Sequence, residues 1–391
     1  MNRRLKDSYI DWVGSIPYEW ETVPLKYVIS EINEKNNPIR FNNILSLTNT
    51  LGVVPYEEKG NQGNNSKEDI TQYKLAYKDT IIVNSMNLKI GSVGLSKYDG
   101  CVSPVYYVFK GKSNTDIRFI NYLFQSEFQK YLGKFGKGIL EIREKIAMYD
   151  VLHAYIPYPS YDIQKRIANY LDEKCSLIDN IIVENNKEIE LLNEYRVSFI
   201  DSQYKSNNTK KIKFDVVVRN EKGTVTSNDK YVGLENIEGF TTKYIETNTN
   251  YLGSEGKRFY KGDLLVNKLR PYLAKSYIAE FDGLCSGEIE VIKNFNGNME
   301  YLKYFTVSNS YLEMVNSSTY GAKMPRANWE FIKNLRIPNI SPEEQNNKVE
   351  IINNMIDKIN NVINYRKKII EKLEEYKKSL IYEVVTGKKE V

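Results

Sequence analysis

Two polar segments of the sequence carry side chains suited to contacting nucleic acid. Each follows a short apolar run expected to be a strand, TIIV at 80–83 and LLV at 264–266. Arginine and lysine can bridge guanine O6 and N7, asparagine can pair with adenine, and serine, tyrosine and lysine can hold phosphates. The candidate contacts are Asn84, Ser85, Asn87, Lys89 and Lys97 in the first segment, and Asn267, Lys268, Arg270, Tyr272 and Lys275 in the second. Ordinary solvated hairpin loops contain the same residue types, so composition alone does not decide between the two interpretations.

A second pair of candidate segments lies further along the chain, ahead of two Ile-Pro dipeptides at 156–157 and 337–338. GKGILEIREK contains Lys137 and Arg143, and GAKMPRANW contains Lys323 and Arg326. Their basic side chains make them further candidates for contacts with nucleic acid.

No group of residues predicts catalysis or a metal site. The single histidine, His153, is more simply explained as structural, and no GxxxxGK[ST] phosphate loop is present. The sequence also lacks an Asn-Pro-Pro-aromatic tetrapeptide of the kind used by amino-group DNA methyltransferases. The three cysteines are far apart and form no CxxC, which argues against a zinc site or a disulfide framework.

The elements that position these segments are duplicated along the chain. Residues 77–110 align without a gap to residues 260–293 at an offset of 183, and the two Ile-Pro dipeptides are followed by a second match at an offset of 181. In each half, short runs rich in β-branched and aromatic residues alternate with loops, and one stretch has helical spacing. Each half therefore begins with an α+β part.

A long helix is predicted to end each half. In each helix, steps of alternately three and four residues give an apolar row, and a second apolar row lies beside it. The first rows are Leu171, Lys174, Ile178, Ile181, Asn185, Glu188, Leu192, Tyr195 and Phe199, and Ile352, Met355, Ile359, Val362, Arg366, Ile369, Leu373, Tyr376 and Leu380. The flanking rows are Cys175, Ile182 and Ile189, and Ile356, Ile363 and Ile370. The simplest way to bury two such faces is to pack the helices against each other, antiparallel about a pseudo-two-fold axis.

One polar residue interrupts the middle of each row. Asn185 and Arg366 are equivalent at the offset of 181, so we expect them to meet at the centre of the coiled coil and to fix its register. The alternative is that both are solvated residues on imperfect seams.

Whole-chain properties fit a soluble protein of more than one domain. With 391 residues the chain is longer than one core usually supports, and no apolar run is long enough to span a membrane. We therefore expect a cytoplasmic protein with no membrane partner. The net charge is only +5, but the positive excess lies in residues 1–160 and 206–340, as expected if those parts meet phosphate.

Several motifs, taken in order, resemble the specificity subunit of type I restriction-modification systems. They are SIPYEWETVPLKYVIS near the start, FGKGILEIREK and YGAKMPRANW before the Ile-Pro junctions, PYPSYDIQKRIANYLDEK and PNISPEEQNNKVEIINNMIDK at the helix starts, and LEEYKKSLIYEVVTGK near the end. The resemblance implies an α+β fold in which two similar target recognition domains are separated by two long antiparallel helices. The expected domains are 1–157, target recognition domain 1; 158–206, the central spacer helix; 207–338, target recognition domain 2; and 339–391, the distal spacer helix.

The resemblance also implies a function. The chain would read a bipartite site in double-stranded DNA and direct two modification subunits, which methylate adenine, together with restriction subunits. It would itself be non-catalytic and bind no cofactor, with S-adenosylmethionine, ATP and Mg²⁺ bound by the partner subunits. The alternative is a protein-interaction scaffold with two globular modules on a coiled coil and no direct DNA readout.

Overall fold

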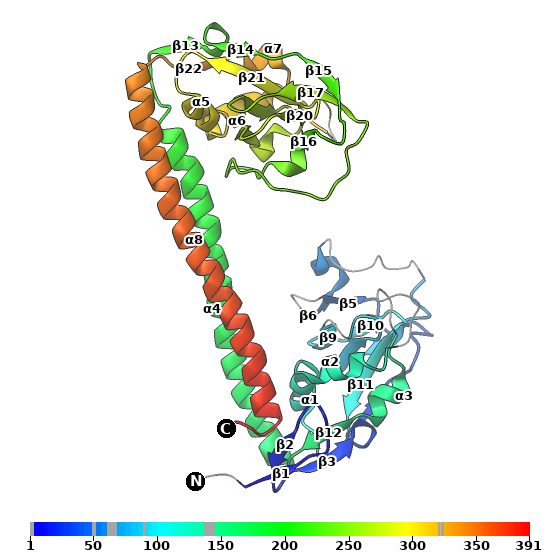
Figure 1. Cartoon of the computed structure of the whole chain (residues 1–391). Coiled ribbons are helices and arrows are strands. Elements are labelled where there is room, and N and C mark those ends of the chain that lie inside the picture. The colour runs from blue at the N-terminus through cyan, green and yellow to red at the C-terminus, as the bar shows by residue number, and fades with distance from the viewer. Residues whose placement is uncertain are drawn as a thin grey trace. The chain divides into compact units, whose positions relative to one another are not determined.

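The chain folds into two compact units in a computed structural model, which describes residues 4–48, 52–60, 69–88, 91–136, 145–319, 321 and 324–391. Unit 1 comprises residues 1–184 together with 369–391, and unit 2 comprises residues 185–368. Each unit contains an α+β part and a segment of each of two long helices (Figure 1). The predicted α+β fold with long antiparallel helices is confirmed.

The long helices are α4 (Tyr161–Ser202) and α8 (Pro342–Val385). They run antiparallel in both units. In unit 2, Arg196 of α4 bonds to Asn360 of α8; in unit 1, Lys377 of α8 pairs with Asp179 of α4. Proline residues precede or open both helices and none interrupts them, which explains their unbroken length.

The buried rows of the two helices differ from the predicted ones at every second position. In α4 the buried or half-buried row is Leu171, Cys175, Ile178, Ile182, Asn185, Ile189, Leu192 and Arg196, and in α8 it is Ile352, Ile356, Ile359, Ile363, Arg366, Ile370, Leu373, Lys377 and Leu380. Alternate members of the predicted rows, such as Ile181, Tyr195, Val362 and Tyr376, are exposed. Two adjacent apolar rows satisfy the same spacing, and packing against the partner helix selects between them.

Asn185 and Arg366 meet in the structure. Nη1 of Arg366 donates a hydrogen bond of 3.2 Å to Oδ1 of Asn185, and Nη2 forms an ion pair of 2.8 Å with Oε2 of Glu188. Asn185 is buried and Arg366 is half-buried, so neither is a fully solvated surface residue. That this contact fixes the register of the helices stays a prediction.

Unit 1 is built around a four-stranded sheet in the order β4-β11-β8-β9. The strands of the unit are β1 (Leu5–Asp7), β2 (Ser15–Pro17), β3 (Glu21–Pro24), β4 (Ile29–Glu31), β5 (Leu45–Thr48), β6 (Gly52–Pro55), β7 (Lys74–Ala76), β8 (Ile81–Asn84), β9 (Val93–Leu95), β10 (Gly100–Val102), β11 (Tyr106–Gly111) and β12 (Tyr155–Tyr158). Its shorter helices are α1 (Ile117–Phe124), α2 (Phe128–Gly133) and α3 (Met148–His153). The remaining strands form the antiparallel pairs β1-β2, β5-β6, β7-β10 and β3-β12.

Unit 2 contains the corresponding sheet in the order β14-β21-β18-β19. Its strands are β13 (Thr209–Lys211), β14 (Val216–Val218), β15 (Lys222–Thr224), β16 (Lys230–Val232), β17 (Glu255–Phe259), β18 (Leu264–Asn267), β19 (Ser276–Ile278), β20 (Gly283–Cys285), β21 (Ile289–Phe295) and β22 (Arg336–Pro338). Its shorter helices are α5 (Met299–Phe305), α6 (Asn309–Ser317) and α7 (Trp329–Ile332). The units differ in their second sheet, because β15, β17, β20 and β16 form one four-stranded sheet in unit 2.

A buried glutamine ties each long helix to its α+β part in the same way. The side-chain oxygen of Gln164 accepts a 3.0 Å hydrogen bond from the backbone N–H of Asp116, which caps α1, and Gln345 accepts one of 2.8 Å from Asn298, which caps α5. Both glutamines are almost completely buried. The residues are equivalent in the two halves, so the duplication preserves the junction between helix and sheet.

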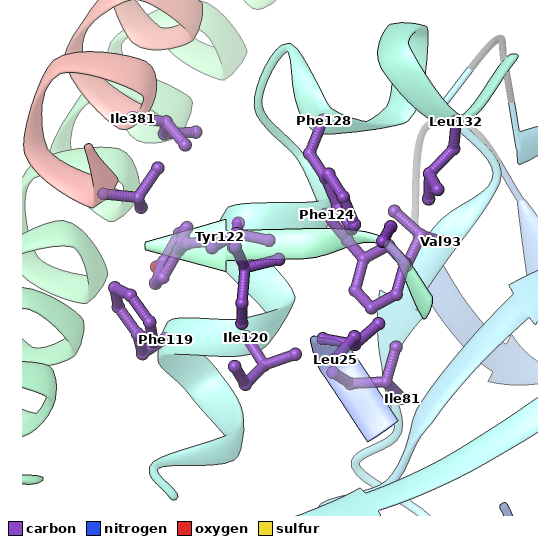
Figure 2. Packing of buried hydrophobic residues seen from close by; sticks show 14 of the residues in the cluster. Leu25, Ile81, Val93, Phe119, Ile120, Tyr122, Phe124, Phe128, Leu132 and Ile381 are labelled. Carbon is purple, nitrogen blue, oxygen red and sulfur yellow. The ribbon is translucent and has the colours of Figure 1, made fainter. Parts of the chain in front are cut away.

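The core of each unit extends onto its helix pair. In unit 1, Phe119, Ile120 and Phe124 of α1 belong to the same buried cluster as Ile81 of β8 and Ile381 of α8, as Figure 2 shows from close by. In unit 2 the corresponding cluster joins Tyr301 and Phe305 of α5 to residues of both long helices, including Ile200 and Ile352. Each α+β part therefore shares one core with the nearby helix segments.

The three cysteines are free and buried, and burial suppresses their reactivity. It raises the pKa of Cys101 and of Cys175 to about 11 and the pKa of Cys285 to about 12, in each case because the charged thiolate is poorly solvated. At pH 8 we expect each thiol to react with iodoacetamide roughly 100-fold more slowly than an exposed cysteine. Mass spectrometry of alkylated peptides, native against urea-unfolded, measures this. Rapid labelling of any of the three in the native chain would contradict the prediction.

None of the helices in the described part of the chain is long and apolar enough to cross a membrane.

Candidate nucleic-acid interface

In unit 2 the predicted polar segment forms a tight loop between β18 and β19. These strands pair antiparallel, from Leu264 opposite Ile278 to Val266 opposite Ser276. The loop contains a single turn of 3-10 helix, η6 (Pro271–Leu273), and the residue on each side of that turn has a positive φ, 52° at Arg270 and 48° at Ala274. This conformation costs about 1–2 kcal/mol for a residue with a Cβ atom, so surrounding contacts must hold the loop in place.

Asn267 at the end of β18 provides most of those contacts. Its side-chain Nδ2 donates to the carbonyl oxygens of Leu269 at 2.9 Å and Arg270 at 3.3 Å, and its Oδ1 accepts from the backbone N–H of Lys275 at 3.1 Å. The side chain is buried. Asn267 therefore organises the loop from inside, and direct contact with a ligand would require the loop to open.

The second candidate segment of unit 2 lies against this loop. The backbone N–H of Arg270 donates to the carbonyl oxygen of Pro325 at 2.7 Å, and that of Ala327 donates to the carbonyl oxygen of Lys268 at 2.9 Å. Leu269 and Arg326 form an isolated antiparallel bridge between these bonds. The structure thus joins two segments that the sequence analysis had identified separately, and we call residues 267–275 with 324–327 the unit 2 loop pair.

The same junction occurs in unit 1. The backbone N–H of Ile146 donates to the carbonyl oxygen of Ser85 at 3.0 Å. At the repeat offsets, Ile146 corresponds to Ala327 and Ser85 to Lys268, so this bond is the counterpart of the one in unit 2. Both halves therefore share one backbone hydrogen bond at equivalent positions, and different side chains surround it.

Among the predicted residues of the unit 2 loop pair, Arg270 and Tyr272 are accessible and make no side-chain hydrogen bond or ion pair within the described residues. Tyr272 is 47% exposed and Arg270 is half-buried, and within the described residues the Arg270 guanidinium has no hydrogen-bond or ion-pair partner. Met324, which is not among the predicted residues, is 57% exposed on the adjoining segment. A free guanidinium and an exposed aromatic ring on the same loop suit contact with a base edge or a phosphate.

The other described cations of the loop pair are bound within the protein. Nζ of Lys268 pairs with Oε2 of the buried Glu290 at 2.9 Å, and Lys257 pairs with the same oxygen at 2.9 Å. Nζ of Lys275 donates to the carbonyl oxygen of Leu234 at 2.6 Å, and burial lowers the pKa of this lysine. Two lysines share one carboxylate, so this cluster keeps a net positive charge next to the loop.

Arg326 is exposed and also has a partner. Its Nε donates to Oε2 of Glu288 at 2.8 Å, and Nη2 pairs with the other carboxylate oxygen. The pair is at the surface, where such interactions contribute little to stability, and an incoming anion could compete for the guanidinium.

In unit 1 the predicted residues are divided between structural and exposed positions. Asn84 is buried and accepts a 3.1 Å hydrogen bond from the N–H of Met86, and the buried Ser85 hydroxyl donates to the carbonyl oxygen of Val105 at 3.1 Å. Asn87 is exposed in the turn. Lys97 is also exposed, but it follows β9 at the opposite end of the β8-β9 hairpin, because Ile81 pairs with Leu95. The structure therefore does not bring Lys97 together with Asn87.

Four predicted residues, Lys89, Lys137, Arg143 and Lys323, lie outside the described residues. Among the residues that are described, no group of three or more His, Cys, Asp or Glu side chains could hold a metal ion.

A known protein family matches a large part of the first half of the chain. Residues 17–194 match the family model described as "Type I restriction modification DNA specificity domain". Over this range the chain is similar to the specificity family. The match includes most of the α+β part of unit 1 and most of α4, so the family predicted from the sequence motifs is confirmed over this range.

One curated relative of the specificity family is the type I restriction enzyme EcoDI specificity subunit of Escherichia coli, 26% identical over 121 residues. The alignment covers 30% of this chain and 27% of that protein, so it spans about a quarter of the relative's length.

Solved structures extend the likeness in fold to nearly the whole chain. A chain from a study of complex assembly and conformational transition of the type I R-M system superimposes with a TM-score of 0.71 at 12% identity, covering 95% of this chain and 99% of that one. The HsdS subunit from Thermoanaerobacter tengcongensis gives a TM-score of 0.52, also at 12% identity, with 95% and 98% covered. The fold of this chain is therefore shared with these two chains over nearly its whole length.

Proposed function

We propose that the chain is a non-catalytic, sequence-specific DNA-binding subunit of a type I restriction-modification complex. Each α+β part reads one half of a bipartite target in double-stranded DNA. The observation that carries the proposal is the repeated loop junction, Ser85 with Ile146 in unit 1 and Lys268 with Ala327 in unit 2. One frame carrying different exposed side chains suits two readers of different base sequences, and the family match over residues 17–194 supports DNA as the ligand.

The partners in this proposal are two modification subunits and, through them, restriction subunits. Support comes from the long helices, which leave apolar side chains uncovered: Leu177, Val183 and Leu191 on α4 are each half exposed or more, as is Tyr365 on α8. Several exposed apolar side chains on one element are typical of protein-binding surfaces. In this proposal the partner subunits methylate adenine and bind S-adenosylmethionine, ATP and Mg²⁺. The complex acts on DNA in the cytoplasm.

The test uses the complex with its modification subunits. Mapping methylated adenines in the host genome yields the target, and mobility shifts then compare that target with a scrambled duplex. We expect a preference of at least about 10³-fold, and an affinity that falls steeply between 50 and 200 mM salt because phosphate contacts release counterions. Equal binding to all sequences would overturn the proposal and favour the protein-interaction scaffold. The same conclusion would follow if the complex retained no DNA and its binding to partner proteins were unchanged by nuclease treatment.

A further inference from the structure

Unit 2 contains a cavity of about 710 Å³ between its two helix segments and a loop of its α+β part. The helix walls include Arg196 and Asn360, and the loop wall includes Glu238 and Lys243. The volume is in the range of sites that bind small molecules, about 300–1,000 Å³. Nothing in the proposed reading of DNA uses this cavity.

Arg196 is a buried cation in the wall of this cavity. It is only 4% exposed, its Nη2 donates a 2.7 Å hydrogen bond to Oδ1 of Asn360, and its Nε is buried with no partner. No ion pair links it to a carboxylate anywhere in the described residues. A buried charge without a counter-charge is costly, and an unpaired buried N–H adds about 1–3 kcal/mol.

Comparison of the two halves shows that a carboxylate is missing beside Arg196. At the offset of 181, Arg196 corresponds to Lys377 and Asn360 corresponds to Asp179. In unit 1, Nζ of Lys377 lies 2.6 and 2.7 Å from the two carboxylate oxygens of Asp179. The same helix-to-helix contact is therefore a cation with a carboxylate in unit 1 and a cation with a neutral amide in unit 2.

No other charged group of the cavity forms an ion pair with Arg196 in the described residues. The Glu238 carboxylate accepts a hydrogen bond from the hydroxyl of Thr241, and it raises the pKa of Arg196 only against a larger lowering by burial. Glu194, Lys243 and Lys367 complete the charged lining. Three cations against two carboxylates leave the cavity with a net positive charge.

We infer that this cavity binds a small organic or inorganic anion, whose carboxylate or phosphate group pairs with Arg196 as Asp179 pairs with Lys377 in unit 1. The guanidinium is suited to this because its N–H groups can donate two parallel hydrogen bonds to one oxyanion. Apolar walls from Ile363 and Phe240 leave room for a non-polar body on the ligand. The inference does not depend on the proposed DNA-binding function.

Isothermal titration calorimetry of the full chain tests the inference, with sodium benzoate and inorganic phosphate as separate probes and chloride holding the ionic strength constant. We expect saturable binding of one probe at one site, and the identity of that probe distinguishes a carboxylate from a phosphate ligand. Arg196→Gln should weaken binding at least tenfold. Asn360→Asp should weaken it as much, because the new carboxylate takes the place of the ligand.

Thermal melting separates these effects from misfolding. Asn360→Asp should raise the melting temperature of the ligand-free chain by about 2–4 °C, since it restores the ion pair of unit 1. Asn361→Asp is the matched control: it adds the same charge at the neighbouring exposed position and should change neither binding nor melting. The inference fails if neither probe binds saturably, if Arg196→Gln binds as the wild type does, or if Asn360→Asp lowers the melting temperature.

Discussion

Replacing Arg270 by alanine is expected to relax recognition at one position of one half-site, by about 1–3 kcal/mol, and to leave the other half-site unchanged. The Arg270 side chain lies in unit 2, and within the described residues its guanidinium has no hydrogen-bond or ion-pair partner. Its backbone N–H donates a hydrogen bond to the carbonyl oxygen of Pro325, which holds the backbone in place. Truncation is therefore expected to remove a contact with DNA, and it breaks no side-chain hydrogen bond or ion pair within the described residues. Binding of the complex to duplexes substituted at each target position measures the change.

Lys97→Ala provides the matched control, because it removes an exposed cation from unit 1 at the far end of the β8-β9 hairpin. We expect this variant to keep the sequence preference of the wild type. If Arg270→Ala instead weakens binding equally to every sequence and lowers the salt slope by about 1, Arg270 contacts a phosphate and does not read a base.

The duplication made most of the fold predictable. It placed equivalent strands at β8 and β18, and it placed the two long helices after equivalent Ile-Pro junctions. Such features depend on local patterns, namely β-branched runs, helical spacing and proline positions, which a single sequence displays directly. The equivalence of Asn185 and Arg366 similarly predicted that they would meet, because a pseudo-two-fold axis brings equivalent residues together.

The parts that could not be predicted depend on which residues meet in space. Both apolar rows of each helix satisfy the heptad spacing, so only packing could show that Cys175 and Ile182 are more buried than Lys174 and Ile181. The sequence suggests that Lys268 is a free cation, but in the structure it forms an ion pair with Glu290 on the neighbouring strand.

Lys275 and Asn267 illustrate the same limit. Lys275 reaches the carbonyl oxygen of Leu234, 41 residues away in the chain. Asn267 was a predicted DNA contact because asparagine can pair with adenine. In the structure its side chain is buried and holds the loop by hydrogen bonds.

Replacing Asn267 by alanine should therefore destabilise unit 2 and also abolish discrimination at the position that Arg270 reads. The substitution removes three hydrogen bonds, to Leu269, Arg270 and Lys275, that hold a loop with positive φ at Arg270 and Ala274. At about 0.5–1.5 kcal/mol each, their loss predicts a decrease of about 1.5–4.5 kcal/mol in the free energy of unfolding. Urea unfolding followed by fluorescence measures this.

Asn84→Ala is the matched substitution in unit 1, because Asn84 corresponds to Asn267 at the offset of 183. Within the described residues its side chain makes one such bond, to Met86, so we expect a loss of only about 1 kcal/mol. In the double variant of Asn267 and Arg270, discrimination should be no worse than in Arg270→Ala alone, because one residue acts through the other. Additive losses of discrimination would show that Asn267 contacts DNA itself, and the loop would then have to open when it binds.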